Sequence, residues 1–195
     1  MRRLPITIIA LLFPTAAFAH PDISHAAGLL HGFEHPLGGI DHILAMVAVG
    51  IFAFVLGGRA LYLVPLSFVA MMIAGFLLGA SAIDVPFVEL GIALSSIVIG
   101  GAAALGRPMP VVGAMTLVGV FALFHGHAHG AEMPADGGGV LYAAGFVAAT
   151  AVLHVTGIGA ALLGTKLIGR YGRLAARIAG GVFAIGGIGV LSGWV

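Results

Sequence analysis

The sequence predicts an all-α protein, a polytopic membrane bundle of six transmembrane helices that follows a cleaved signal peptide. Hydrophobic residues make up 61% of the 195 residues and charged residues only 8%, whereas a typical soluble domain has about 25% charged residues. The apolar residues also gather in windows long enough to cross a bilayer. So few charges cannot cover a water-facing surface, which argues against a soluble domain, a disordered chain or a nucleic-acid-binding protein.

Residues 1–19 match the pattern of a secretory signal peptide. A short basic start precedes the apolar run 4–18, which ends in the small-residue cleavage pattern Ala17-Phe18-Ala19. We therefore expect cleavage after Ala19, which leaves residues 20–195 as one six-helix transmembrane domain. An uncleaved first helix is the alternative. After cleavage the chain would begin with His20, whose α-amine and imidazole can chelate one metal ion together.

The six transmembrane helices are expected between glycine and proline breakers. Gly57-Gly58 separates the first two windows, Pro86 precedes the third, and the stretch from Gly106 to Pro110 precedes the fourth. Three consecutive glycines, Gly137–Gly139, precede the fifth window, and the basic segment 164–175 precedes the sixth. The expected helices span 38–57, 60–80, 87–105, 109–125, 139–163 and 176–194.

The charged residues predict the orientation of these helices. If the mature N-terminus is outside, every basic residue after the signal peptide falls on the cytoplasmic side, as the positive-inside rule requires. These residues are Arg59, Arg107, Lys166, Arg170, Arg173 and Arg177. The sequence therefore predicts a multi-pass protein of the bacterial inner membrane with a periplasmic mature N-terminus. Its outer face is rich in histidine and acidic residues, a polarity that suits drawing a cation inward.

Histidine is the residue type that carries the expected chemistry, since the chain has nine histidines and no cysteine. The first cluster comprises His35, Asp41, His42 and Met46. Pro36 suits the first turn of a helix, on which His42 and Met46 would share a face. Imidazole, carboxylate and thioether together suit late first-row divalent metals. The alternative is that Asp41 caps the helix and His42 hydrogen-bonds a neighbour.

The second cluster comprises His125, His127 and His129, followed by Glu132. On a helix, His125 and His129 would share a face and His127 would point away, whereas in extended backbone all three would align. Either geometry offers two or three neutral imidazoles, which are the commonest metal ligands. A solvated polar loop is the alternative interpretation.

His154 lies in the middle of the fifth expected helix. A histidine at that depth usually faces the interior of the bundle. There it serves either as a metal ligand or as one partner of an interhelical hydrogen bond. The adjacent Met71 and Met72 are expected only to pack.

A short motif offers a competing enzymatic hypothesis. His31, Glu34 and His35 match the H-x-x-E-H pattern of inverted zinc proteases, in which two imidazoles hold a metal and the acid acts as a base. Pro36 follows directly, however, and disfavours a helical conformation at His35. The sequence also has no GxxxxGK[ST] motif and therefore no P-loop ATPase of its own.

At these residues the sequence resembles the HupE/UreJ family of nickel and cobalt permeases, which are linked to hydrogenase and urease maturation. A second histidine motif of the family reads FHGHAHGAE here, at Phe124–Glu132. The first-helix signature of the family, HPxxGxDHxxxMxxxG, is present in full at His35, Pro36, Gly39, Asp41, His42, Met46 and Gly50.

The resemblance implies uptake of nickel(II) or cobalt(II), as a transported substrate and toward the cytoplasm, without a prosthetic group or an ATPase. By motif position it implies roles for His35, Asp41, His42, His125, His127, His129 and Glu132. His154 is matched only by its place in the span.

Three functions thus compete for this sequence: a metal-ion permease, a membrane metalloprotease, and a metal- or haem-binding membrane module. The permease, which is not an enzyme, is the preferred hypothesis. Its expected partners are the divalent metal ion and the lipid bilayer, and no nucleic acid, with assembly into a homo-oligomer left open. Metal uptake by proteoliposomes that contain only this protein separates the permease from the other two.

Overall fold

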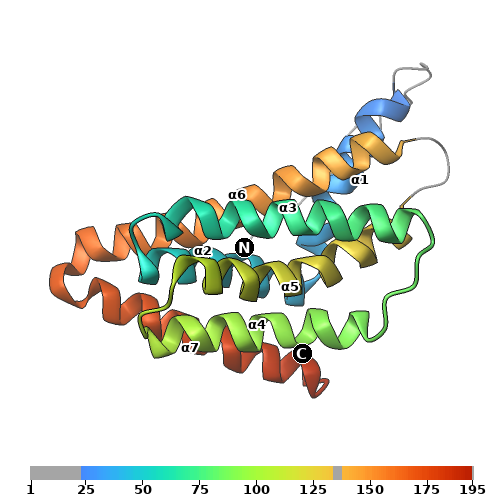
Figure 1. Cartoon of the computed structure of the whole chain (residues 1–195). Helices are drawn as coiled ribbons and strands as arrows, with labels where there is room; N and C mark the ends of the chain where they lie inside the picture. Colours follow the sequence, from blue (N-terminus) through green and yellow to red (C-terminus); the bar gives the residue numbers. More distant parts are fainter. Residues whose placement is uncertain (1–22, 134–137, 195) are drawn as a thin grey trace, which may run out of the picture.

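The computed structural model describes residues 23–133 and 138–194, so the expected signal peptide and His20 lie outside the described residues. Figure 1 shows a bundle in which every regular element of these ranges is helical. A 3-10 turn, Gly169–Tyr171, joins the last two helices. The α-helices are α1 (Ile23–Gly38), α2 (Ile40–Leu56), α3 (Ala60–Ala80), α4 (Val88–Leu105), α5 (Val111–Ala131), α6 (Gly139–Ile168) and α7 (Gly172–Leu191). The predicted all-α fold class is confirmed.

Several helical stretches are long and apolar enough to cross a bilayer. By length and composition these are α3, α4, α5 and the continuous stretch Gly139–Leu191. That last stretch contains two helices, because the chain turns back near Gly169, where φ is 56°, and α7 returns alongside the bundle (Figure 1). The pair α1 and α2 passes the same test only when taken together, and it is bent by 86° at its break. Counted once, this pair joins the other five helices in a polytopic membrane bundle.

The ends of the helices differ in part from the sequence-based expectation. Helix α3 has the expected bounds, and α2 and α4 deviate by only one or two residues. The expectation that the fourth window ends at residue 125 is wrong, since α5 continues to Ala131. Helix α6 likewise continues to Ile168. Polar residues end an apolar window, but they do not by themselves end the ladder of backbone hydrogen bonds.

Helix α1 also departs from the expectation, which placed the first helix at 38–57 and Pro36 in its first turn. In the structure Pro36 lies in the last turn of α1, and the helix includes His35 despite the proline after it. A proline inside a helix removes one backbone hydrogen bond. The packing of α1 on α6 offsets this loss, because Gly32 lies directly against the backbone carbonyl of Tyr142.

The break between α1 and α2 lies at Gly39, which has an extended backbone with φ −103° and ψ 120°. A Cβ atom at this residue would lie 2.7 Å from Oδ1 of Asp41 and 3.0 Å from Nδ1 of His42. A side chain here would therefore push both groups away. Glycine at this position lets the chain turn between α1 and α2 and leaves room for the side chains of Asp41 and His42 beside the turn.

Helices α3 and α5 approach each other so closely that their backbones touch. Gly75 and Gly79 of α3 and Gly126 and Gly130 of α5 each lie where a Cβ would overlap a carbonyl of the facing helix. Small residues at such crossings are the usual means by which membrane helices associate. Because these α5 glycines sit beside its histidines, the close crossing also fixes how deep the histidines lie in the bundle.

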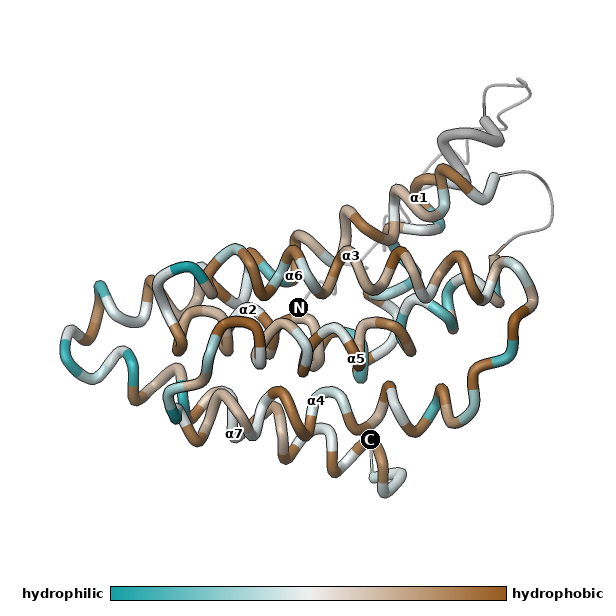
Figure 2. Tube along the Cα trace, in the orientation of Figure 1, coloured by the Kyte–Doolittle hydropathy of each residue, from teal (hydrophilic) through white to brown (hydrophobic). Residues whose placement is uncertain are grey.

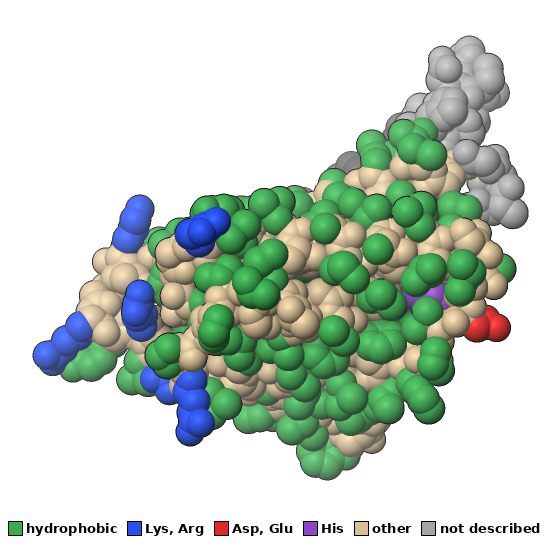
Figure 3. Space-filling view, viewed as in Figure 1, with side chains coloured by type: hydrophobic (Ala, Val, Ile, Leu, Met, Phe, Trp, Pro, Cys, Tyr) green, Lys and Arg blue, Asp and Glu red, His purple; other side chains and the backbone are tan. Residues whose placement is uncertain are grey.

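The charged residues gather at the two ends of the bundle. Figure 2 shows mostly hydrophobic residues along the helices and the more hydrophilic ones mainly near the ends. Lysine and arginine side chains cluster at one end and acidic side chains at the other (Figure 3). At the basic end, Nε and Nη2 of Arg177 donate to the carbonyls of Ala104 and Leu105 at 2.9 and 2.8 Å and so satisfy the last turn of α4. The long sides of the bundle expose large apolar residues, such as Leu66, Leu77 and Val112.

Candidate metal-binding site

Four helices converge at the end of the bundle opposite the arginines. Side chains from the last turns of α1 and α5 contact the first turn of α2 and the first half of α6 there. Most of the polar residues singled out in the sequence lie at this point, although they come from segments far apart in the chain. Among the residues gathered there, His125 and His129 of α5 are the most buried, with exposed fractions of 0% and 1%.

An outer group of three residues has the arrangement of metal ligands. Nε2 of His35 lies 2.8 Å from Oε2 of Glu132, which is 97 residues later in the chain. With His129, each of these residues offers one ligand atom, and the three atoms lie within 4.8 Å of one another. Two ligands bound at about 2.1 Å to one ion are at most about 4.2 Å apart. A small side-chain movement would therefore let all three bind one ion.

Asp41 and His42 form a second, partly buried group one corner further along the chain. Oδ1 of Asp41 accepts the backbone N–H of His42 at 2.9 Å and lies 2.9 Å from Nδ1 of the same imidazole. Since a carboxylate only accepts hydrogen bonds, Nδ1 carries the proton and Nε2 carries the lone pair. Nε2 is buried and has no hydrogen-bond partner among the described residues. It is therefore free to bind a metal ion.

The imidazole rings of these groups form a continuous row into the bundle. The ring centroids of His35 and His129, of His129 and His42, and of His42 and His125 are each 4.8 Å apart, and each pair meets edge to face. Neither ring nitrogen of His129 has a hydrogen-bond partner in the described part of the chain. The row thus runs from an exposed carboxylate, that of Glu132, to a fully buried imidazole.

Ser95 of α4 fixes the inner end of this row. Its hydroxyl donates to the carbonyl of Ile92 at 2.5 Å, and its oxygen lies 2.9 Å from Nε2 of His125. The hydroxyl proton is already used, so the oxygen accepts from Nε2–H. Nδ1 of His125 then holds the lone pair, and it has no partner within the described ranges. Ser95 could not be identified from the sequence, because a lone serine in an apolar helix gives no pattern.

His127 is the one member of the α5 motif that lies apart from the row. Nε2 of His127 is 2.8 Å from the carbonyl oxygen of Ile83, in the connection between α3 and α4, and donates to it. Of the helical and extended alternatives for this motif, the structure has the helical one. Helix α5 includes all three histidines, and only His125 and His129 share the inward face.

Two further predicted residues lie deeper in the bundle. Met46 of α2 is fully buried, and its sulfur lies 3.3 Å from the Thr150 hydroxyl. His154 of α6 has an exposed fraction of 2% and packs edge-on against Phe68 at 5.0 Å. Neither ring nitrogen of His154 has a partner among the residues described, so no interhelical hydrogen bond is found for this residue.

The protease-like motif also has a definite geometry. Because α1 is helical through His35, the rings of His31 and His35 lie 5.9 Å apart on one side of the helix. His35 is therefore helical, although the proline after it disfavours this conformation. Glu34, however, is exposed, and His35 is paired with Glu132 rather than with this acid.

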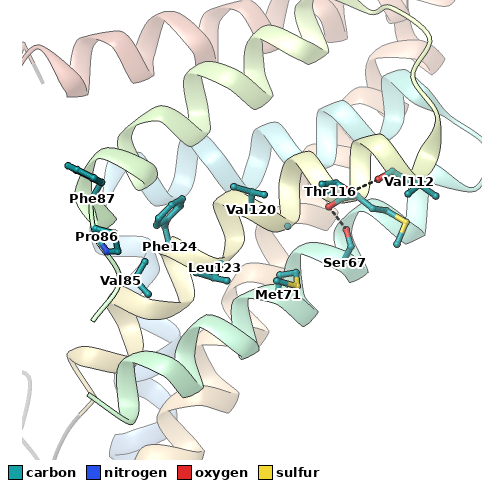
Figure 4. A pocket seen from close by; sticks show the side chains of 12 residues that line it. Ser67, Met71, Val85, Pro86, Phe87, Val112, Thr116, Val120, Leu123 and Phe124 are labelled. Atoms are coloured by element: carbon teal, nitrogen blue, oxygen red, sulfur yellow. Dashed lines mark hydrogen bonds between the residues drawn. The ribbon is translucent and has the colours of Figure 1, made fainter. Parts of the chain in front are cut away.

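An apolar groove of about 690 Å³ lies on the side of the bundle, away from the imidazole row. Residues of α3 and α5 and of the connection before α4 line it (Figure 4), among them Met71, Phe87 and Phe124. No histidine lines it. Its apolar lining sets it apart from the metal-binding candidates.

The chain is similar to known proteins over nearly its whole length. Residues 8–190 match the family described as HupE / UreJ protein. The chain is 46% identical to Protein HupE of Rhizobium leguminosarum bv. viciae over 191 residues, which cover 98% of each chain. No solved structure gives a significant match.

Proposed function

Because the chain belongs to the HupE/UreJ family, we propose that it is a permease that takes up nickel(II) or cobalt(II) across the bacterial inner membrane for metalloenzyme maturation. The observation that carries this proposal is the row of imidazoles, spaced by 4.8 Å, that leads from the exposed Glu132 to the buried His125. The metal is the transported substrate, and neither a prosthetic group nor an ATPase is part of the proposal.

Capture begins at the outer group. Glu132 and His35 are accessible from one end of the bundle, and together with the buried His129 they offer one carboxylate oxygen and two imidazole nitrogens. This donor set is typical of sites for late first-row divalent ions. An ion held there replaces part of its hydration shell with protein ligands, which prepares it to move into the bundle.

Transfer inward then depends on Asp41 and His42. A divalent ion that enters a region of low dielectric constant needs both ligands and compensating charge. Oδ1 of Asp41 supplies the charge, and the free Nε2 of His42 supplies a ligand within one ring spacing of both His129 and His125. The ion therefore moves between imidazoles without crossing an apolar gap.

The membrane potential supplies the driving force in this proposal. Moving one charge through 100 mV releases about 2.3 kcal/mol, so a divalent ion gains about 4.6 kcal/mol. The histidine-rich end is assigned to the periplasm because the arginines and the lysine lie at the opposite end. In this orientation, residues 1–19 are an export signal, and the mature chain begins with His20, whose α-amine and imidazole can chelate a metal ion.

A membrane metalloprotease built on His31, Glu34 and His35 fits less well. A catalytic glutamate must reach a water on the metal held by the two histidines. Here Glu34 is exposed, and Nε2 of His35 faces Glu132. The same nitrogen cannot serve both arrangements at once, and the imidazole row accounts for more of the histidines.

The deciding experiment is uptake of radioactive nickel or cobalt by proteoliposomes that contain the purified full-length protein and an imposed inside-negative potential. Accumulation that depends on the potential supports the permease. The His127→Ala variant should accumulate metal as wild type does, because His127 lies on the same helix as His125 and His129 but is bonded to the Ile83 carbonyl, outside the row. Liposomes that bind metal without accumulating it would instead favour a metal-binding module, and cleavage of membrane peptides would favour the protease.

A further inference from the structure

The imidazole row ends at His42 and His125 inside the bundle. The next imidazole toward the arginine-rich end is His154, on α6, and a gap separates it from the row. His42 and Met46 are one turn apart on α2, and Thr150 and His154 are one turn apart on α6. His42 and His154 are therefore about two helical turns, or about 11 Å, apart along the bundle, and Met46 and Thr150 lie between them.

Two thioethers and a hydroxyl occupy this gap. Oγ1 of Thr150 lies 3.3 Å from Sδ of Met46 on α2 and 3.5 Å from Sδ of Met72 on α3. All three side chains have an exposed fraction of 0%. The two sulfur atoms therefore come from different helices and meet at one hydroxyl in the centre of the bundle.

The hydroxyl of Thr150 behaves differently from the other threonine hydroxyls in the described ranges. Thr116, Thr156 and Thr165 each donate to the backbone carbonyl four residues earlier, at 2.8 to 3.1 Å, as helical threonines commonly do. Thr150 is directed at the two sulfur atoms instead. Its orientation is therefore set by the sulfur pair and not by its own helix.

The surroundings of the cluster connect it to imidazoles on both sides. Phe68 lies one turn before Met72 on α3, and its ring meets those of His125 and His154, with centroids 5.8 and 5.0 Å apart. Both nitrogens of His154 and Nδ1 of His125 have no hydrogen-bond partner among the described side chains and backbone. Phe68 thus contacts two imidazoles with unused nitrogens, and it lies one helical turn from Met72.

We propose that Met46, Met72 and Thr150 form a second metal-binding position, a transit site between His42 and His154 that accepts soft and borderline cations and excludes hard ones. This inference rests on the proposed function, since it adds a further selective position to the same pathway. Thioether sulfur is a ligand for soft cations and a poor one for magnesium, calcium or manganese, which prefer oxygen. The carboxylates of Glu132 and Asp41 alone would not make this distinction.

A weak site suits its place in the pathway. A conducting site must bind well enough to admit an ion and loosely enough to release it. Neutral thioethers add no negative charge at the centre of the membrane, so they do not trap a divalent ion as a buried carboxylate would. The ion then continues to the free nitrogens of His154.

The test combines a direct reading of the sulfur ligands with transport. The variants are Met46→Leu, Met72→Leu and their double variant, because leucine keeps the volume and removes the sulfur, an exchange that buried cores tolerate well. Met71→Leu is the matched control. Met71 is adjacent to Met72 in sequence, yet it lines the apolar groove on the side of the bundle (Figure 4).

The first measurement uses silver(I), a soft ion, added to the purified full-length protein in lipid nanodiscs. X-ray absorption at the silver edge is expected to show sulfur neighbours in wild type and in Met71→Leu, and to lose them in the double variant. The stoichiometry of bound silver should fall by one. Identical spectra for wild type and the double variant would overturn the proposal, and the cluster would then have only a role in packing.

The second measurement is initial nickel uptake into proteoliposomes. The double variant is expected to transport about tenfold more slowly than wild type, with Met71→Leu unchanged, and to let manganese inhibit nickel uptake more strongly. Wild-type rates and wild-type manganese inhibition in the double variant would overturn the proposal. If wild type itself accumulated no metal but silver still bound through sulfur, the proposed function would fail while the sulfur site would stand.

Discussion

Nδ1 of His42 lies 2.9 Å from Oδ1 of Asp41, its neighbour in the chain, and the same oxygen accepts the backbone N–H of His42. A carboxylate on one ring nitrogen fixes the tautomer and makes the other nitrogen a better ligand. Two adjacent residues thus provide the charge and the directed lone pair that a cation needs on entering the bundle. Gly39 makes room for the arrangement, because a side chain there would collide with both groups.

The first prediction concerns this pair. Asp41→Asn keeps an oxygen that can accept the Nδ1 proton but removes the negative charge, and His42→Ala removes the ligand. Each is expected to lower initial nickel uptake by more than tenfold at both limiting and saturating metal, with unchanged protein levels in the membrane. The measurement is uptake per unit of membrane protein. Wild-type rates at both concentrations would remove the start of α2 from the mechanism.

The second prediction separates capture from conduction. Glu132 is exposed and pairs with His35 at 2.8 Å, so Glu132→Gln should weaken the outer group without blocking the inner row. The metal concentration for half-maximal uptake is expected to rise about tenfold, equivalent to about 1.4 kcal/mol, whereas the rate at saturating metal changes little. Uptake measured over a range of metal concentrations tests this. A proportional loss at every concentration would place Glu132 in conduction instead.

The third prediction concerns the serine that orients the innermost imidazole of the row. In Ser95→Ala the Nε2–H of His125 loses its acceptor, and Nδ1 is no longer held as the free nitrogen. Loss of such an outer partner typically lowers metal affinity by about 10- to 100-fold, and a comparable loss of nickel affinity is expected here. Isothermal titration of the purified protein measures it. Ser96→Ala is the adjacent control, since Ser96 bonds only the Ala93 carbonyl within the described residues.

Much of the bundle is predictable from hydropathy, because each apolar window must satisfy its backbone inside the bilayer. Helix α3 illustrates this, with the expected bounds of 60–80. The pairing of His125 with His129 on one face also follows from helical spacing once α5 is known to be helical. The inward orientation of His154 follows from its depth.

The remaining features depend on contacts between distant residues. Helix α1 contains Pro36 and is held by the approach of Gly32 to Tyr142, which no local pattern reveals. The continuation of α5 past residue 125 depends in the same way on glycines that face α3. Met72 and Thr150 look like ordinary residues of membrane helices, and only the crossing of α2, α3 and α6 brings them together.

The fourth prediction tests the close crossing of α3 and α5. A Cβ at Gly126 would overlap the Met72 carbonyl, whereas a Cβ at Gly159 would meet no atom within 4 Å. Gly126→Ala should therefore destabilise the protein by about 1–3 kcal/mol, as overpacking usually does, and lower its unfolding midpoint in detergent. Gly159→Ala should leave the midpoint unchanged. Equal unfolding midpoints for the two variants would contradict the close backbone contact between α3 and α5 at Gly126.

The last prediction concerns the orientation of the bundle in the membrane. Lys166, Arg170, Arg173 and Arg177 lie near the turn between α6 and α7, and basic residues remain on the cytoplasmic side. The connection between α5 and α6 is at the opposite end of α6, beside Glu132, and should face the periplasm. Alkaline phosphatase is active only after export, so it should be active when fused after Gly138 and inactive when fused after Gly169. Green fluorescent protein at the same two positions should give the reverse result. If the reporters placed Gly138 in the cytoplasm and Gly169 in the periplasm, the imidazole row would open toward the cytoplasm, and the protein would then be oriented for metal export.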